Sequence, residues 1–185
     1  MYCSEALFER MQVLEDHEHE ERPLLKGMRC AAVLIPILKK QAFPILYTLR
    51  SQHLRHHAGQ FSFPGGVVEE GETPWQAALR EAHEEIGLEA RDVTRLGRIS
   101  DAYSPRGFHI ECFVAMVEPF EPELNLEEVE RVIEVDMHQL FDPKRHSYRP
   151  WNKDERHHIH YFDFEEGLVW GVTGRITANL REALQ

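Results

Sequence analysis

The order of hydrophobic and polar residues along the chain changes between a strand-like and a helix-like period. Short apolar runs rich in β-branched and aromatic residues predict strands at residues 28–38, 43–49, 61–63, 93–99, 109–117, 156–164 and 168–170. Apolar residues three or four positions apart predict helices at residues 4–14, 74–86 and 173–184. Strands that alternate with helices indicate an α/β domain. We expect that domain at residues 28–185, after an N-terminal helix and an acidic linker at residues 1–27.

The helix predicted at residues 74–86 has clear signals at both ends. Thr73 can cap its N-terminus, Gln76 can return the second bond of a capping box, and Pro74 stands at the first helical position. Gly87 supplies a left-handed residue after the last turn. The apolar residues of the helix share one face, which should be buried: Trp75, Ala78, Leu79, Ala82 and Ile86.

A second stripe on the same helix is acidic. Glu81, Glu84 and Glu85 stand at i, i+3 and i+4 and therefore share a face. Carboxylates this close repel one another and raise one another's pKa. A divalent cation removes the repulsion, and hard oxygen ligands suit Mg²⁺ or Mn²⁺, which share their sites with substrate phosphates. The alternative is an ordinary solvated face of charged residues.

The surroundings of the acidic stripe favour a metal site. Gly65 and Gly66 form a loop in which the backbone can approach a ligand closely, and Glu72 is within reach of the Arg80 guanidinium. Residues 66–88 resemble a complete Nudix box. The matching positions are Gly66, then Glu72 after five intervening residues, then the run REAHEEIGL at residues 80–88 after seven more. Ala82 stands where that family more often has a larger aliphatic residue.

The resemblance implies the Nudix fold, a mixed central sheet sandwiched between helices, and a hydrolase of nucleoside diphosphates linked to another moiety. It implies Glu81, Glu84 and Glu85 as catalytic metal ligands, with the Gly65 carbonyl as a further ligand. Arg80 would orient the glutamates and be held by Glu72. A metal-activated water would attack a phosphorus of the pyrophosphate, with Glu84 or Glu85 as the proton acceptor.

The stretch before the box, residues 46–66, concentrates positive charge. Arg50 and Arg55 lie among His53, His56 and His57, and the planar fork of arginine suits phosphate. The alternative is that either arginine pairs with neighbouring glutamates. This stretch resembles the signature of coenzyme A pyrophosphatases, a branch of the Nudix family. The matching residues are Leu46, Thr48, Arg50-Ser51, Arg55, Gly59 and Phe63-Pro64-Gly65-Gly66. Tyr47 departs from the signature, which has leucine there, and we interpret the change as repacking.

This second resemblance implies hydrolysis of coenzyme A to 3′,5′-ADP and 4′-phosphopantetheine. Arg50, Arg55, Gly59 and Gly66 would bind the substrate. One alternative is a Nudix enzyme that acts on an ADP-sugar, NADH or a nucleoside triphosphate. Another is a non-catalytic nucleotide sensor, which the intact set of box carboxylates disfavours.

The charge and composition of the chain limit the kinds of molecule that it can bind. The formal charge of −11, from 32 acidic and 21 basic residues, argues against a broad nucleic-acid surface. No apolar run has the length of a membrane span, and the N-terminus lacks the order of a signal peptide. Cys3, Cys30 and Cys112 form no metal-binding spacing and suit a reducing cytosol. We therefore expect a cytoplasmic monomer or homodimer with a small nucleotide as its partner.

Two further groups of residues are candidates for the site. Glu128 precedes an alternating strand and is our candidate for an additional acid from outside the box, or else a surface charge. His157, His158 and His160 follow one another in RHHIHYFDF, where a strand puts the last two on one face. A zinc site would need further ligands that the sequence does not show.

Overall fold

A mixed sheet forms the centre of the molecule. The computed structural model describes residues 8–11, 14, 27–151 and 154–185. The strands of the central sheet are β1 (Arg29–Leu38), β2 (Ile45–Arg50), β3 (Phe61–Ser62), β4 (Gly65–Val67), β5 (Val93–Ser104), β6 (Phe108–Val117) and β7 (Val129–Val135). Their order is β3-β2-β1-β6-β5, with β4 also paired to β1 and β7 to β2. Only the β1–β6 pair is parallel among these.

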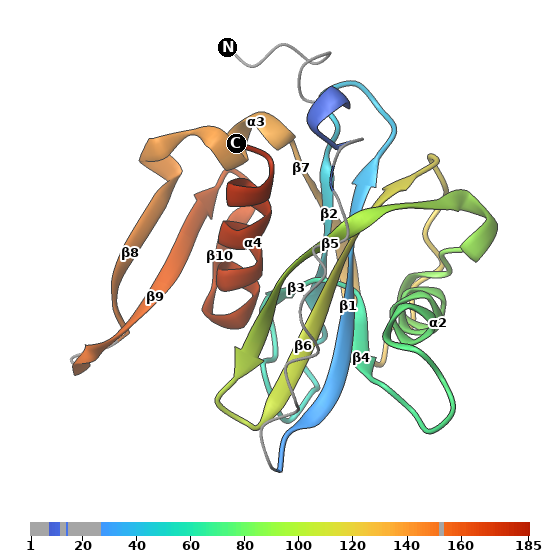
Figure 1. Cartoon of the computed structure of the whole chain (residues 1–185), viewed down its shortest axis with the longest axis horizontal. Helices are drawn as coiled ribbons and strands as arrows, with labels where there is room; N and C mark the ends of the chain where they lie inside the picture. The colour runs from blue at the N-terminus through green and yellow to red at the C-terminus, as the bar shows by residue number, and fades with distance from the viewer. Residues whose placement is uncertain (1–7, 12–13, 15–26, 152–153) are drawn as a thin grey trace.

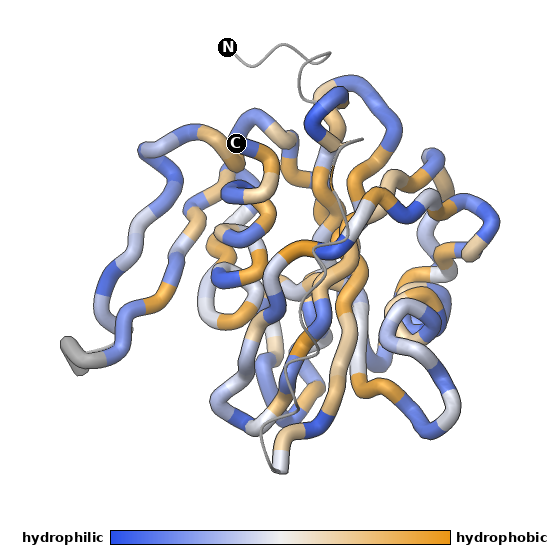
Figure 2. Tube along the Cα trace, viewed as in Figure 1, coloured by the Kyte–Doolittle hydropathy of each residue, from blue (hydrophilic) through white to orange (hydrophobic). Residues whose placement is uncertain are grey.

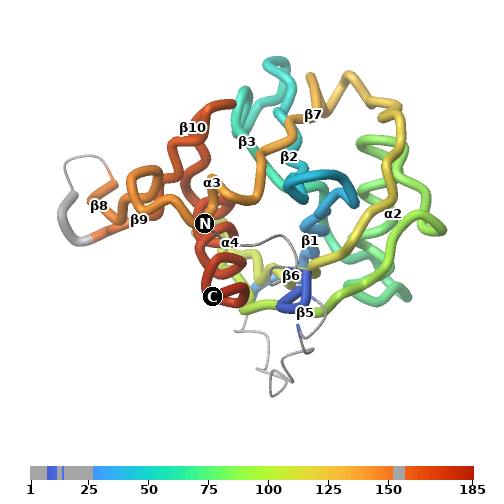
Figure 3. The backbone as a smooth tube through the Cα atoms, turned by 90° about the horizontal axis from the view of Figure 1, so that it is seen from above, coloured from blue at the N-terminus to red at the C-terminus, as the bar shows by residue number. Residues whose placement is uncertain are grey.

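Helices cover both faces of this sheet, as Figures 1 and 3 show. One face carries α2 (Pro74–Ile86), and the other carries α4 (Gly171–Ala183). Beyond α4 lies a separate antiparallel sheet of β8 (His146–Trp151), β9 (Asp154–Phe164) and β10 (Gly167–Trp170). The remaining elements are α3 (Met137–Phe141) and the short 3₁₀ turns η1 (Ala90–Asp92) and η2 (Pro143–Arg145). The predicted mixed sheet between helices is confirmed.

The central strand β1 is apolar along nearly its whole length because it is covered on both sides. Ala31, Ile35 and Ile37 pack in the core beneath α4, whereas Ala32 and Leu34 pack beneath α2. Figure 2 shows the same distribution, with hydrophobic residues along the central strands and mainly hydrophilic residues in the β8–β9 hairpin. One core holds α2 against the sheet, and the other holds α4.

The ends of α2 are those that the sequence predicts. The Thr73 side chain accepts a bond from the Gln76 N–H, and the Gln76 side chain accepts one from the Thr73 N–H. Gly87 adopts the left-handed conformation, with φ 68°. The buried face differs from the predicted one. Ala78, Ala82 and Ile86 are buried as expected, Glu85 and Ala77 are buried as well, and Trp75 and Leu79 are only half-buried.

Several predicted boundaries were wrong. Residues 101–104, expected in a loop, continue β5 after an irregularity between Ile99 and Ala102. The strand can continue because the Asp101 side chain is buried in an ion pair with Arg98 and a 2.6 Å contact with the His109 ring. The closing helix begins at Gly171 rather than at residue 173. The sequence did not predict β4, β8 or α3.

The structure describes only part of the helix predicted near the N-terminus. Residues 8–11 are helical, and the side chains of Met11 and Leu14 are buried in the core beneath α4. The remainder of the helix predicted at residues 4–14, with Cys3 before it, lies outside the described residues. Cys30 and Cys112 are free thiols. Within the described ranges, no helix has both the length and the apolar character needed to span a membrane.

Candidate active site

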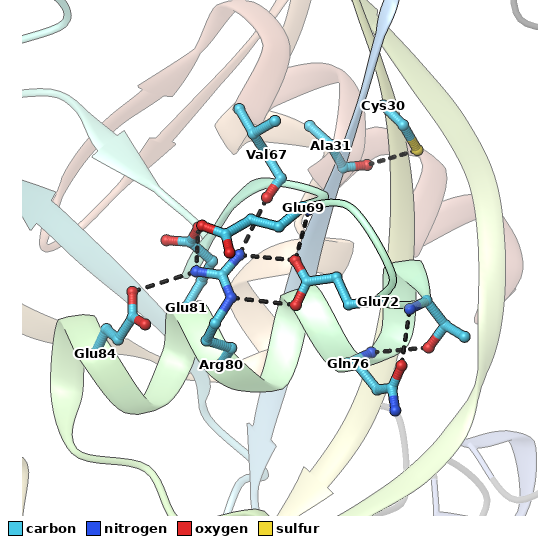
Figure 4. Close-up of polar contacts among 10 residues, drawn as sticks. Cys30, Ala31, Val67, Glu69, Glu72, Gln76, Arg80, Glu81 and Glu84 are labelled. Carbon is cyan, nitrogen blue, oxygen red and sulfur yellow. Dashed lines mark hydrogen bonds and ion pairs between the residues drawn. The ribbon is translucent and has the colours of Figure 1, made fainter.

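Arg80 is the centre of a group of carboxylates on α2 and the loop before it (Figure 4). Its guanidinium donates to both oxygens of Glu72, at 3.2 Å and 2.9 Å. The Nη1 atom donates to Glu81 at 2.9 Å and to Glu84 at 3.2 Å, and Nη2 donates to the Val67 carbonyl at 3.1 Å. The loop residue Glu72 therefore fixes the arginine, and the arginine fixes two of the three box glutamates.

Two glycines let the β4 backbone lie directly against its neighbours. A Cβ on Gly66 would stand 2.3 Å from Oε1 of Glu81, and one on Gly65 would stand 2.3 Å from the Ala32 carbonyl oxygen. Real Cβ atoms do not approach other atoms this closely, so any side chain here would displace Glu81 or separate β4 from β1. Both glycines are required by the packing around the carboxylates.

Glu85 is the buried member of the box, with 3% of its surface exposed. Burial, followed by the charge of Glu81, raises its pKa to about 8; Arg50 and a backbone bond from Gly65 act in the opposite direction. Its Oε2 atom has no hydrogen-bond partner within the described part of the chain. Such an oxygen is ready to accept a cation or a donor.

Glu128 lies near Glu81 and Glu85. Its charge raises the pKa of both Glu81 and Glu85, although burial is the larger cause for each. The Ser51 N–H donates to the Glu128 carbonyl at 2.8 Å, and the Asn125 N–H donates to the Glu85 carbonyl at 3.0 Å. These bonds tie the segment before β7 to the end of β2 and to α2, and bring Glu128 near the box carboxylates.

Of the two candidate arginines, only Arg50 is part of this group. It ends β2 close enough to Glu85 to lower the pKa of that carboxyl. Its buried Nε atom has no hydrogen-bond partner among the residues described. Arg55 is exposed in the loop of residues 51–60. Gly59 closes this loop in the left-handed region, with φ 65°, and its N–H donates to the Arg50 carbonyl at 3.0 Å.

The acidic residues fit a hard divalent cation by their chemistry. Glu81, Glu85 and Glu128 offer carboxylate oxygens, one of them buried and unpartnered, which are the ligands that Mg²⁺ and Mn²⁺ prefer. No three described acidic, histidine or cysteine side chains already converge on one point. Arg80 holds one oxygen of Glu81, so metal binding requires a local shift of side chains.

Glu84 is the exposed member of the box. Its side chain is 55% exposed and lines an open cavity of about 470 Å³ at the C-terminal end of α2, together with His83, Gly87, Glu123, Leu124 and Asn125. Sequence reasoning grouped the three glutamates on one face. It could not separate the exposed Glu84 from the buried Glu85, because that difference depends on how α2 packs in the fold.

The other candidates lie away from the box. His158 and His160 share a face of β9 and both contact the ring of Tyr148. Among the described residues this face contains no set of three metal ligands. Tyr47, the departure from the signature, is fully buried, stacks on Phe63 and hydrogen-bonds to Thr177.

Comparison with known proteins gives consistent results. Residues 28–166 match the model of the NUDIX domain. Proteins of Yersinia pestis and Yersinia pseudotuberculosis named "Uncharacterized Nudix hydrolase NudL" are 35% identical over 157 residues, which is 83% of this chain and 79% of theirs. The crystal structure of a Nudix hydrolase from M. smegmatis, RenU, superposes with a TM-score of 0.52 at 26% identity, over 62% of this chain and 74% of that one. A MutT/nudix family protein from Enterococcus faecalis superposes with a TM-score of 0.56 at 14% identity, over 89% of this chain and 63% of that one. At this identity the comparison shows a similar fold only.

Proposed function

This chain belongs to the Nudix hydrolase family, and from that premise we propose that it hydrolyses the pyrophosphate bond of coenzyme A or its derivatives. Nudix hydrolases generally cleave pyrophosphate linkages of nucleotide derivatives with a divalent cation. The proposed products are 3′,5′-ADP and 4′-phosphopantetheine, or its acylated form.

The observation that carries this proposal is the position of the coenzyme A pyrophosphatase signature. The signature runs along β2, through the loop of residues 51–60, and enters β4 at Gly65 and Gly66. Its first arginine, Arg50, ends beside the buried Glu85, and its last glycine, Gly66, lies against Glu81. Two residues of the signature thus lie against box carboxylates, which supports a shared role in binding a pyrophosphate substrate.

In the proposed mechanism, Glu81, Glu84 and Glu85 would hold the cation, with the Gly65 carbonyl and Glu128 as further candidate ligands. When bound, the cation lowers the pKa of a water and neutralises charge on the phosphate oxygens. Arg80 keeps Glu81 and Glu84 aligned through the contacts described above. Either Glu84 or Glu85 accepts the proton of the attacking water.

We assign the two signature arginines to different phosphate groups of coenzyme A. Arg50 is next to the carboxylates and is assigned to the scissile pyrophosphate. Arg55, exposed in the adjoining loop, is assigned to the ribose 3′-phosphate, which distinguishes coenzyme A from dephospho-coenzyme A. A charge-assisted phosphate contact contributes about 1.5–3 kcal/mol, or roughly ten- to hundredfold in specificity constant.

Specificity constants for coenzyme A, dephospho-coenzyme A, ADP-ribose and NADH test the proposal. The wild type should prefer coenzyme A over dephospho-coenzyme A by that factor. Arg55→Ala should remove the preference and leave turnover of dephospho-coenzyme A intact, whereas Arg50→Ala should reduce both. Faster turnover of ADP-ribose or NADH than of coenzyme A would contradict the proposal and favour the alternative substrates.

A further inference from the structure

Two buried nitrogen atoms lack partners where α4 meets the second sheet. His160, on β9, is only 8% exposed, and its Nε2 atom has no hydrogen-bond partner in the described ranges. The Nη1 atom of Arg181, on α4, is equally buried and has no partner there either. A buried polar nitrogen that loses water on folding and gains no hydrogen-bond partner destabilises the folded state. Two such atoms in one interface indicate that a ligand supplies the missing acceptor.

The packing of α4 directs Arg181 toward His160. A Cβ on Gly174 would lie 2.5 Å from the His160 carbonyl oxygen, so this face of α4 rests directly on β9. Ala178 and Arg181, four and seven residues after Gly174, share that face. Long helical side chains lean toward the N-terminus of their helix, which returns the Arg181 guanidinium toward His160.

His146, on β8, joins the same cluster. Its Nε2 atom is 2.9 Å from Nδ1 of His160, and the two rings stack with 5.1 Å between centroids. When the His146 Nε2–H donates in this bond, the other nitrogen of His160 carries its proton and becomes a donor. Burial first, and then the charges of Arg175, His146 and Arg181, lower the pKa of His160 to about 4, so the surroundings are positive. Glu182 opposes this effect at His146, whose pKa is nevertheless lowered by burial and by Arg181.

We propose that His146, His160 and Arg181 form a binding site for a small free oxyanion of the phosphate class. The anion accepts from Nη1 of Arg181 and from Nε2 of His160 and compensates the positive charge of the Arg181 guanidinium. Because both donors are buried, inorganic phosphate fits the site better than a phosphate group on a large molecule. The site is separate from the box, because α2 and α4 cover opposite faces of the central sheet.

The test is thermal unfolding of the full chain during a phosphate titration, in EDTA and with chloride replaced to keep the ionic strength constant. Phosphate at about tenfold its Kd should raise the Tm by about 3–6 °C. Arg181→Met keeps the side-chain length and should abolish this rise. In phosphate-free buffer the same variant should melt at the wild-type temperature or above it, because the unpartnered donor is gone.

Arg149→Gln is the matched control. Arg149 stacks over Tyr161 at 4.2 Å, on the face of β8 away from His146, so its loss removes one positive charge and should leave the phosphate response unchanged. Glycerol 3-phosphate should give a smaller rise than inorganic phosphate, and an equal rise would contradict the preference for a small free anion.

An independent readout is the Nε2 resonance of His160 in ¹⁵N spectra of the wild type, which should move with phosphate in parallel with the Tm. A wild-type Tm that does not change with phosphate concentration would mean that the site holds only water. An equal shift in Arg181→Met would mean that phosphate binds elsewhere. Either result overturns the proposal.

Discussion

Replacement of Glu85 by Gln should stabilise the metal-free protein while it reduces turnover by orders of magnitude. Burial and the neighbouring Glu81 raise the pKa of Glu85 from 4.5 to about 8. An acid with a higher pKa in the folded than in the unfolded chain makes the folded state the better proton binder. Stability is therefore lost as the pH rises from the unfolded pKa through the folded one, and Gln removes that loss.

The magnitude follows from the two pKa values. A shift from 4.5 to about 8 costs the folded state about 3 kcal/mol at pH 7 and about 5 kcal/mol well above pH 8. The Gln amide places an N–H₂ group where the unpartnered Oε2 of Glu85 lies, which offsets part of the gain. The net stabilisation should be about 2–3 kcal/mol at pH 7, or about 4–12 °C in Tm.

Calorimetry in EDTA across pH 5 to 8 measures this effect. The wild type should lose stability over this range, and Glu85→Gln should show a flatter profile and a higher Tm at the upper end. Glu84→Gln is the matched control, because Glu84 is 55% exposed and its pair with Arg80 contributes no more than about 1 kcal/mol. A Glu85→Gln variant that melts at or below the wild-type temperature at pH 8, or that keeps near-normal turnover, would refute the reasoning.

Gly66→Ala should lower activity far more than stability, because its Cβ would stand 2.3 Å from Oε1 of Glu81; full activity at an unchanged Tm would contradict this. Tyr47→Phe should lower the free energy of unfolding by about 1 kcal/mol, measured by urea titration, because it removes a buried 3.1 Å bond to Thr177. An unchanged midpoint would show that this bond contributes nothing. Millimolar Mg²⁺ should raise the Tm of the wild type but not of the Glu81→Gln, Glu85→Gln double variant, because the cation binds only the folded carboxylates. A shift of equal size in both would place the metal elsewhere.

Features encoded by neighbouring residues could be predicted from the sequence. The capping box of Thr73 and Gln76 and the left-handed Gly87 fix the ends of α2, whatever packs against it. The contact of Arg80 with Glu72 also follows from their spacing and the loop between them. The prediction that Tyr47 repacks the core agrees with its complete burial.

Features that depend on distant residues could not be predicted. Asp101 resembles a loop residue in the sequence, yet within the sheet it pairs with Arg98 and contacts the His109 ring. Strand β8 has no run of apolar residues and contains Pro150, and it forms because β9 supplies its hydrogen-bond partners. The segment before β7 is likewise distant in sequence from Glu85, yet its Asn125 N–H donates to the Glu85 carbonyl.

Product analysis of coenzyme A incubated with the purified protein and Mg²⁺ or Mn²⁺ tests the central proposal most directly. The expected result is stoichiometric 3′,5′-ADP and 4′-phosphopantetheine, formed by the wild type and not by Glu85→Gln. Intact coenzyme A in a preparation that hydrolyses ADP-ribose, NADH or a nucleoside triphosphate would contradict the assignment of substrate. Intact substrates throughout, with both metals, would contradict the assignment of catalysis itself.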